Sequence, residues 1–150
     1  MTAWTRILCA VDFSEGARQA LADAADLARR HGAELTLLHV WEAPHAVATM
    51  AVVAWPVPTG AEAEELAAEL ERWKQEAERL AGTRVRIAFG HGAPGAAIVR
   101  MAEAGRFDVV VVGTRRHGLA RALLGSVAEH VVRHAPCPVL VARPPPDWGD

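Results

Sequence analysis

The segment from Gly113 to Ser126 holds the residues best suited to binding an anion. It begins where a run of four valines ends, and it closes on Gly125-Ser126, where we expect a helix to begin. Backbone N–H groups at a helix start, together with the helix dipole, favour negative charge. The segment also carries side chains that add positive charge: Arg115, Arg116, His117 and Arg121. These residues allow phosphate binding; the alternative is an ordinary strand-to-helix loop with solvated arginines.

A second glycine pattern, Gly90-His91-Gly92-Ala93-Pro94-Gly95, matches the dinucleotide motif G-x-G-x-x-G. Here it follows the third expected strand and not the first. A dinucleotide site also needs an acidic residue about 20 positions further on, at the end of the next strand. Asp108 instead comes early and begins its strand. We therefore do not interpret this pattern as a nicotinamide site.

Other reactive side chains do not combine into a metal or catalytic set. His130 and His134 lie four residues apart, but no acidic residue or cysteine stands at ligand spacing from them, so we expect solvent-facing histidines and no metal. The nucleophile elbow G-x-S-x-G is not present. Ser14 and Ser126 both stand where helix caps are expected. We identify no catalytic residues.

Short apolar runs alternate along the chain with amphipathic segments of helical length. Strands are expected at Arg6–Val11, Glu34–Val40, Thr83–Phe89, Phe107–Val112 and Pro138–Ala142. Helices are expected from Ser14 to Gly32, behind a capping box at Thr59–Glu62, from Pro94 to Gly105, and behind a second capping box at Ser126–Glu129. This alternation predicts an α/β fold, a three-layer sandwich around a five-stranded parallel sheet.

A ligand of such a sheet lies beyond the carboxyl ends of the strands. The residues that end the expected strands are therefore candidates for a site: Asp12, Val40, Phe89-Gly90 and Gly113. Between the second strand and the second helix, residues Trp41 to Pro58 form a long apolar connection. Loops longer than about 12–15 residues are usually functional or disordered. We expect either a loop packed on the domain or a dimer mate, or a lid over the ligand site.

Composition narrows the class of protein. A chain of 150 residues makes one domain, and its net charge of -2 lacks the basic excess of nucleic-acid-binding proteins. The longest apolar stretch, Ala46–Val57, is shorter than the ~20 residues that span a bilayer, so no membrane partner is expected. Cys9 and Cys137 are isolated, which is typical of reduced thiols in a cytoplasmic protein.

Five blocks of sequence appear in a recognisable order between Trp4 and Arg143. They are Val11-Asp12-Phe13-Ser14, Leu38-His39-Val40, Gly92-Ala93-Pro94, Val112-Gly113-Thr114 with Gly125-Ser126-Val127, and Ala135-Pro136-Cys137-Pro138-Val139-Leu140-Val141. Together they resemble the universal stress protein (UspA) family. The resemblance implies a Rossmann-like sheet of order 3-2-1-4-5 with four helices, of the adenine nucleotide alpha hydrolase-like type. It also implies a domain over residues 1–143 with a Pro-rich tail at 144–150, and homodimers that pair through the Pro138–Ala142 edge strand.

The resemblance further implies a binding site for ATP or another adenine nucleotide, with Mg²⁺ present only with the nucleotide. Its residues would be Ala10, Val11 and Asp12 on the ribose and adenine side, Val40 at the adenine, Val112, Gly113 and Thr114 as the floor, and Gly125, Ser126 and Val127 at the phosphates. The family's ATP binders resemble G-x2-G-x9-G-[S/T]. Here Arg116 replaces the second glycine and the segment is one residue short. Arg115 or Arg116 would then supply guanidinium donors to phosphate in place of backbone groups.

Two functions from different classes remain open on these residues. One is a homodimeric stress-response module that binds ATP and switches partner contacts. The other is an interaction scaffold that binds no nucleotide and recognises an unknown protein partner. Any enzymatic activity would be at most a slow ATPase that relies on Mg²⁺ and Asp12, since the loop offers no evident base.

Overall fold

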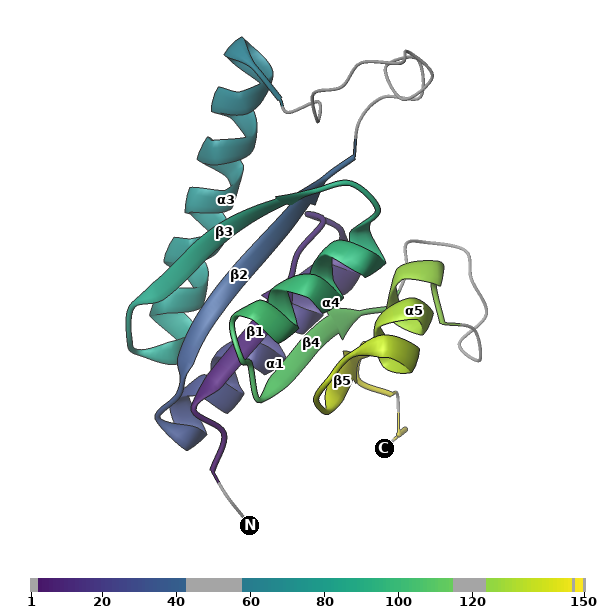
Figure 1. Ribbon diagram of the computed structural model, residues 1–150. Coiled ribbons are helices and arrows are strands. Elements are labelled where there is room, and N and C mark those ends of the chain that lie inside the picture. Colours follow the sequence, from purple (N-terminus) through teal and green to yellow (C-terminus); the bar gives the residue numbers. More distant parts are fainter. Residues whose placement is uncertain (1–2, 43–57, 115–123, 147, 150) are drawn as a thin grey trace.

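Five parallel strands form the middle layer of the molecule, in the order β3-β2-β1-β4-β5 (Figure 1). The computed structural model describes residues 3–42, 58–114, 124–146 and 148–149. The elements are β1 (Arg6–Ala10), α1 (Glu15–His31), β2 (Glu34–Trp41), α3 (Gly60–Ala81), β3 (Val85–His91), α4 (Pro94–Ala104), β4 (Val109–Gly113), α5 (Ser126–His134) and β5 (Val139–Ala142). The predicted three-layer α/β fold and the strand order 3-2-1-4-5 are both confirmed.

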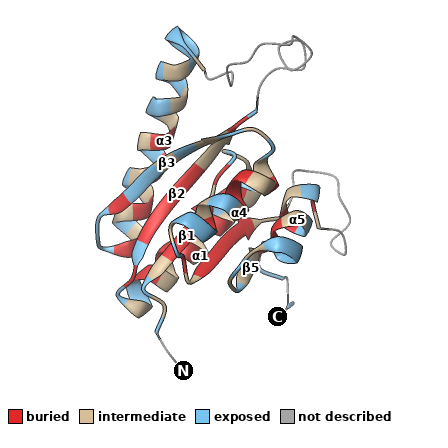
Figure 2. Ribbon diagram, viewed as in Figure 1, coloured by how far each residue is buried: buried red, intermediate tan, exposed pale blue. Residues whose placement is uncertain are grey.

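The valine run of β4 explains why this strand lies inside the sheet. Successive side chains of a strand point to opposite faces. Val109 and Val111 therefore pack with α1 and α3, whereas Val110 and Val112 pack with α4 and α5. A strand buried on both faces needs a continuous apolar sequence, and buried residues accordingly run along the inner strands in Figure 2.

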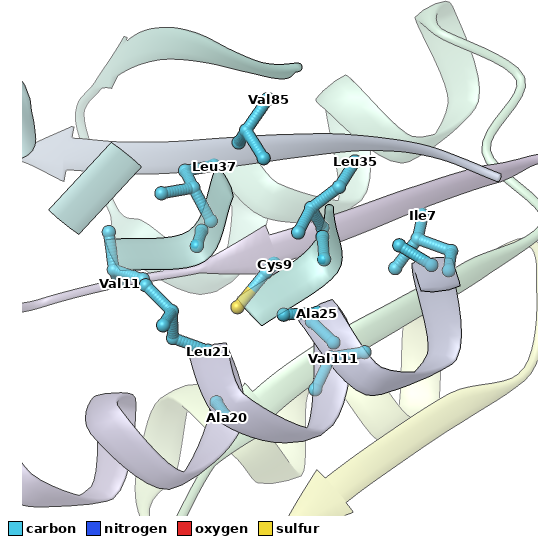
Figure 3. Packing of buried hydrophobic residues seen from close by; sticks show 14 of the residues in the cluster. Ile7, Cys9, Val11, Ala20, Leu21, Ala25, Leu35, Leu37, Val85 and Val111 are labelled. Carbon is cyan, nitrogen blue, oxygen red and sulfur yellow. The ribbon is translucent and has the colours of Figure 1, made fainter. Parts of the chain in front are cut away.

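Helix α1 covers one face through alanines. Its buried side includes Ala20 and Ala25, and Ala25 lies close to Val111 and Cys9 of the sheet in Figure 3. Small side chains let the helix approach the strands closely. Ser14 caps the helix by accepting a hydrogen bond from the Ala17 N–H at 3.2 Å. Cys9 is fully buried there, and burial raises the pKa of its thiol far above the ordinary value.

Two predicted capping boxes are wrong. Helix α3 begins after Thr59, but the Thr59 side chain makes no capping hydrogen bond, and Glu62 accepts one from Trp41 Nε1 at 3.3 Å. Helix α5 begins at Ser126 itself, with Gly125 as its N-cap, one residue earlier than the pattern predicted. A glycine N-cap offers no side chain, so the first turn of α5 receives no side-chain cap there.

The edge strand β3 and the end of β2 also differ from what the sequence predicted. Ile87 and Phe89 of the edge strand β3 are 38% and 48% exposed, although they lie on the same side as buried Val85. Strand β2 continues to Trp41, which the sequence placed in the following loop. Most of that loop, residues 43–57, lies outside the described part of the chain. Among the described helices, none is long and apolar enough to cross a membrane.

Candidate functional site

A cavity of about 480 Å³ opens at the carboxyl ends of β1, β2 and β4. Ten of the residues predicted to bind a ligand line it: Ala10, Val11, Asp12, Val40, Val112, Gly113, Thr114, Gly125, Ser126 and Val127. The other two predicted residues, Arg115 and Arg116, lie outside the described part of the chain. Segments more than 100 residues apart in sequence therefore meet at one edge of the sheet, as parallel topology requires.

The cavity also has walls that the sequence did not single out. Trp41 and Glu42 line it directly after Val40, and Pro94 and Ile98 of α4 line it from another side. Trp41 and Glu42 could have been predicted as lining residues because they follow Val40 at the carboxyl end of β2, although the sequence pattern places Trp41 in the loop. The approach of α4 could not be seen from its own sequence, because it depends on how the helix crosses the sheet.

Asp12 begins a tight turn at the wall of this cavity. Its Oδ1 atom accepts hydrogen bonds from the Ser14 N–H, at 3.0 Å, and from the Ser14 hydroxyl. Phe13 between them has φ of 63°, a left-handed backbone conformation that costs a residue with a side chain about 1–3 kcal/mol. The turn therefore fixes the Asp12 carboxylate against the start of α1.

Aromatic contacts hold Phe13 in that conformation. The Phe13 ring stacks on His39 with centroids 4.5 Å apart and meets Trp73 edge-on at 5.4 Å. His39 Nδ1 lies 2.8 Å from the Val11 carbonyl oxygen, and Phe89 meets the His39 ring edge-on. Arg18 lies over the Trp73 ring at 4.8 Å. The turn and the aromatic residues thus form one packed unit beside the cavity.

Gly113 has a packing reason to be glycine that is independent of any ligand. A Cβ at this position would overlap the backbone carbonyl of Gly16 in α1, and a Cβ at Gly16 would overlap the carbonyl of Thr114. The first turn of α1 therefore lies directly against the end of β4. Gly16 was missed in the sequence, where it looked like an ordinary residue of the first helical turn.

The second glycine pattern also has packing roles. Gly92 has φ of 95°, a conformation that favours glycine, and a Cβ at Gly95 would lie 2.9 Å from the His130 ring. His130 therefore packs between α4 and α5 and stacks on His134, with ring centroids 4.3 Å apart. Among the described residues, no group of three or more His, Cys, Asp or Glu is placed to hold a metal ion.

Comparison with known proteins settles the family. A model of the universal stress protein family matches residues 3–143. The chain belongs to the universal stress protein family. A universal stress protein of Methanocaldococcus jannaschii is 33% identical over 143 residues, covering 95% of this chain and 84% of its own length. The solved universal stress protein UspA of Lactobacillus plantarum superposes with a TM-score of 0.76 at 27% identity, covering 95% of this chain and all of that one.

Two further solved universal stress proteins share the fold and hold adenine nucleotides. One was solved in complex with cAMP and matches with a TM-score of 0.72, covering 95% of this chain and 98% of that one. The other, from Archaeoglobus fulgidus, was solved in complex with dAMP and matches with a TM-score of 0.61, covering 95% of this chain and all of that one. At 24% and 23% identity, these likenesses establish the fold of this universal stress protein and nothing finer.

Proposed function

We propose that this universal stress protein binds an adenine nucleotide, ATP in the first instance, in the cavity at the carboxyl ends of its strands. The observation that carries the proposal is the meeting of Asp12, Val40 and Gly125-Ser126 around one cavity of about 480 Å³. Such a volume lies within the usual range for small-molecule sites. The cAMP and dAMP complexes of two structural neighbours support the class of ligand.

The backbone of Val40 supports the adenine end of the site. Leu38 directs its carbonyl toward β1, where it accepts from the Val11 N–H at 2.9 Å. Backbone groups alternate sides along a strand, so Val40 directs its N–H and carbonyl to that same side. Strand β1 has ended there, and Val40 lines the cavity. An adjacent donor and acceptor suit the edge of adenine, which pairs a ring nitrogen acceptor with the N6 amine.

The part of the cavity lining at the start of α5 supports phosphate. Helix α5 begins at Ser126 after its glycine N-cap, and both residues line the cavity. N–H groups of this first turn, with the helix dipole, favour an anion. The Ser126 hydroxyl adds a donor. Arg115 and Arg116 would contribute positive charge from the intervening segment, and Mg²⁺ would accompany the nucleotide.

The first test is the nucleotide content of the freshly purified protein. The protein is denatured, and the released material is identified by chromatography and mass spectrometry. We expect ATP or ADP near one per chain, or a heat of binding when Mg-ATP is added to protein that has been stripped. An empty protein that gives no heat with Mg-ATP would contradict the proposal and favour the scaffold function, in which the altered loop serves a protein partner.

We further propose a homodimer in the cytoplasm, built on residues 1–143 with 144–150 as a tail. Strand β5 is an edge strand of four residues, and its Leu140 is 36% exposed. Val132 on the neighbouring α5 is 47% exposed. An apolar edge is suited to pairing with a second copy. Sedimentation analysis of Leu140→Lys against wild type tests this, with a monomer expected for the variant.

A further inference from the structure

We infer that His39 is a positioning residue, which keeps the Val40 backbone and the Asp12 turn in the arrangement that receives a nucleotide. The inference rests on the proposed nucleotide binding and names a residue that acts through its neighbours, without touching the ligand as a reacting group. Three observations lead to it: one hydrogen bond, one ring stack and one strained backbone angle.

The hydrogen bond joins the His39 ring to the backbone of Val11. Strand β1 pairs with β2 as far as Ala10, opposite Leu38, and the Val11 N–H continues the ladder to the Leu38 carbonyl. In an uninterrupted parallel ladder, the Val11 carbonyl would next accept from the Val40 N–H. His39 Nδ1 lies 2.8 Å from that carbonyl oxygen instead. Because a carbonyl oxygen only accepts, Nδ1 carries the proton and donates.

The consequence concerns Val40. Its N–H points to the side on which Val11 lies, and the imidazole satisfies the Val11 carbonyl that this N–H would otherwise reach. Val40 therefore keeps its N–H available at the cavity wall. A single side chain replaces one rung of the sheet and thereby opens the position at which an adenine edge can bind.

The ring stack extends the effect to Asp12. Phe13 holds φ of 63° while its ring stacks on His39 at 4.5 Å. Without such support, a residue with a side chain leaves the left-handed region, because the conformation is costly. A change at Phe13 would move Asp12, whose Oδ1 accepts from the Ser14 N–H. His39 is thus the residue that connects the Asp12 wall with the Val40 wall.

Two variants of His39 separate its two contacts. Asn in His39→Asn can place an amide N–H near the position of Nδ1, and it lacks the ring. Phe in His39→Phe keeps the ring and lacks the donor. The matched control is His31→Phe, because His31 also stacks on an aromatic ring, Trp4, and also bonds a backbone group, the Trp4 N–H, at the far end of α1 from the cavity.

The measurements are ¹⁵N NMR of the imidazoles and backbone amides, and calorimetric titration with Mg-ATP. In the wild type we expect His39 to carry its proton on Nδ1. In His39→Phe, which keeps the ring stack, we expect a shifted Val40 amide, an unchanged Ser14 amide and ATP affinity about tenfold lower, the size of one lost hydrogen bond. His39→Asn retains the Val40 amide position but shifts Ser14, because the stack is lost. His31→Phe leaves both amides and the affinity unchanged.

The inference is overturned if Nδ1 of His39 is unprotonated in the wild type, a result that needs no variant to fold. It is also overturned if His39→Phe leaves the Val40 amide in place or binds ATP as the wild type does, or if His39→Asn leaves the Ser14 amide in place. Should the wild type itself bind no ATP, the proposed function fails. The positioning role of His39 is then decided by the amide shifts and the tautomer alone.

Discussion

Gly16 of α1 lies against Gly113 of β4 with no room for a side chain on either residue. The contact is between backbones, so neither partner can move aside as the end of a flexible side chain could. It sets the distance between the first turn of α1 and the end of β4. Because Gly113 and the neighbouring Asp12 turn both line the cavity, this contact also fixes the width of the site at that point.

The first prediction concerns the sign of Gly16→Ala. Within a helix, alanine is intrinsically better than glycine by about 0.8–1.0 kcal/mol. Here the new Cβ would overlap the Thr114 carbonyl, so we expect a net loss of about 1–3 kcal/mol in the free energy of unfolding, measured by urea denaturation. Gly32→Ala serves for comparison, because its Cβ would meet nothing within 4 Å and the variant would lose stability only through the backbone strain of a φ of 62°. A stabilised Gly16→Ala protein would contradict the packing.

The second prediction separates strain from stacking at Phe13. Phe13→Ala loses the ring contacts and still has a Cβ, which disfavours the left-handed angle, whereas Phe13→Gly loses the same contacts but adopts that angle without strain. We therefore expect Phe13→Gly to be more stable than Phe13→Ala by about 1 kcal/mol in chemical denaturation. Equal stability of the two variants would mean that the angle is relaxed in solution.

The third prediction contrasts two serines that the sequence treated alike. Ser14 caps α1 through its hydroxyl, so Ser14→Ala should lower the free energy of unfolding by about 1 kcal/mol. Ser126 is the first residue of α5 and lines the cavity, so Ser126→Ala should leave the stability unchanged and weaken Mg-ATP binding. Denaturation and calorimetry on the same samples check both. Unchanged affinity in both Ser126→Ala and Asp12→Ala would refute the assignment of the site.

The fourth prediction concerns acid stability through Asp108. Its Oδ2 atom accepts from the Thr5 N–H at 2.7 Å, the Arg6 N–H at 2.8 Å and the Thr5 hydroxyl at 2.9 Å. These bonds, led by the Thr5 backbone, lower the pKa of Asp108 below its ordinary value. A lowered pKa in the folded state contributes stability that is complete above the unfolded pKa, near 4, and is lost as pH falls through the folded value.

Asp108→Asn should therefore be less stable than the wild type by about 1 kcal/mol at neutral pH, and the difference should shrink as the pH falls below about 4. Thermal unfolding across pH checks this. The control is Asp26→Asn, since hydrogen bonds from Arg29 and Arg30 lower the pKa of Asp26 on the exposed face of α1, where solvent screens them. A pH-independent difference for Asp108→Asn would show that the carboxylate charge is not what matters.

Periodicity and strand ends were enough to predict the sheet and most of the cavity. The valine run of β4 predicted a buried strand, and Asp12, Val40 and Gly113 follow from the rule that ligands lie at the carboxyl ends of strands. The same rule also gave Phe89-Gly90, which does not line the cavity. The end of α1 was also predicted: the helix stops at Gly32, which adopts the left-handed conformation. These features depend on local sequence and on topology alone.

The features that the sequence did not reveal depend on contacts between distant segments. Gly16 is glycine because of Thr114, and the role of His39 depends on where β1 stops and where the Phe13 ring lies. The capping boxes failed for a related reason. Glu62 matches the pattern of a box, but in the folded chain its carboxylate meets the Trp41 indole. A local sequence pattern shows which interactions a side chain is able to make, and tertiary contacts determine which of them it makes.

The sheet separates the buried apolar residues of the described chain into two clusters, one on each of its faces. One cluster lies under α1 and α3 and includes Val11 and Ala17. The other lies under α4 and α5 and includes Ile98 and Ala128. All four of these residues line the same cavity. A ligand bound there would contact both clusters at once and so couple them. Its binding would then raise the free energy of unfolding of the whole domain as one cooperative unit, and would not stabilise the phosphate-binding loop alone.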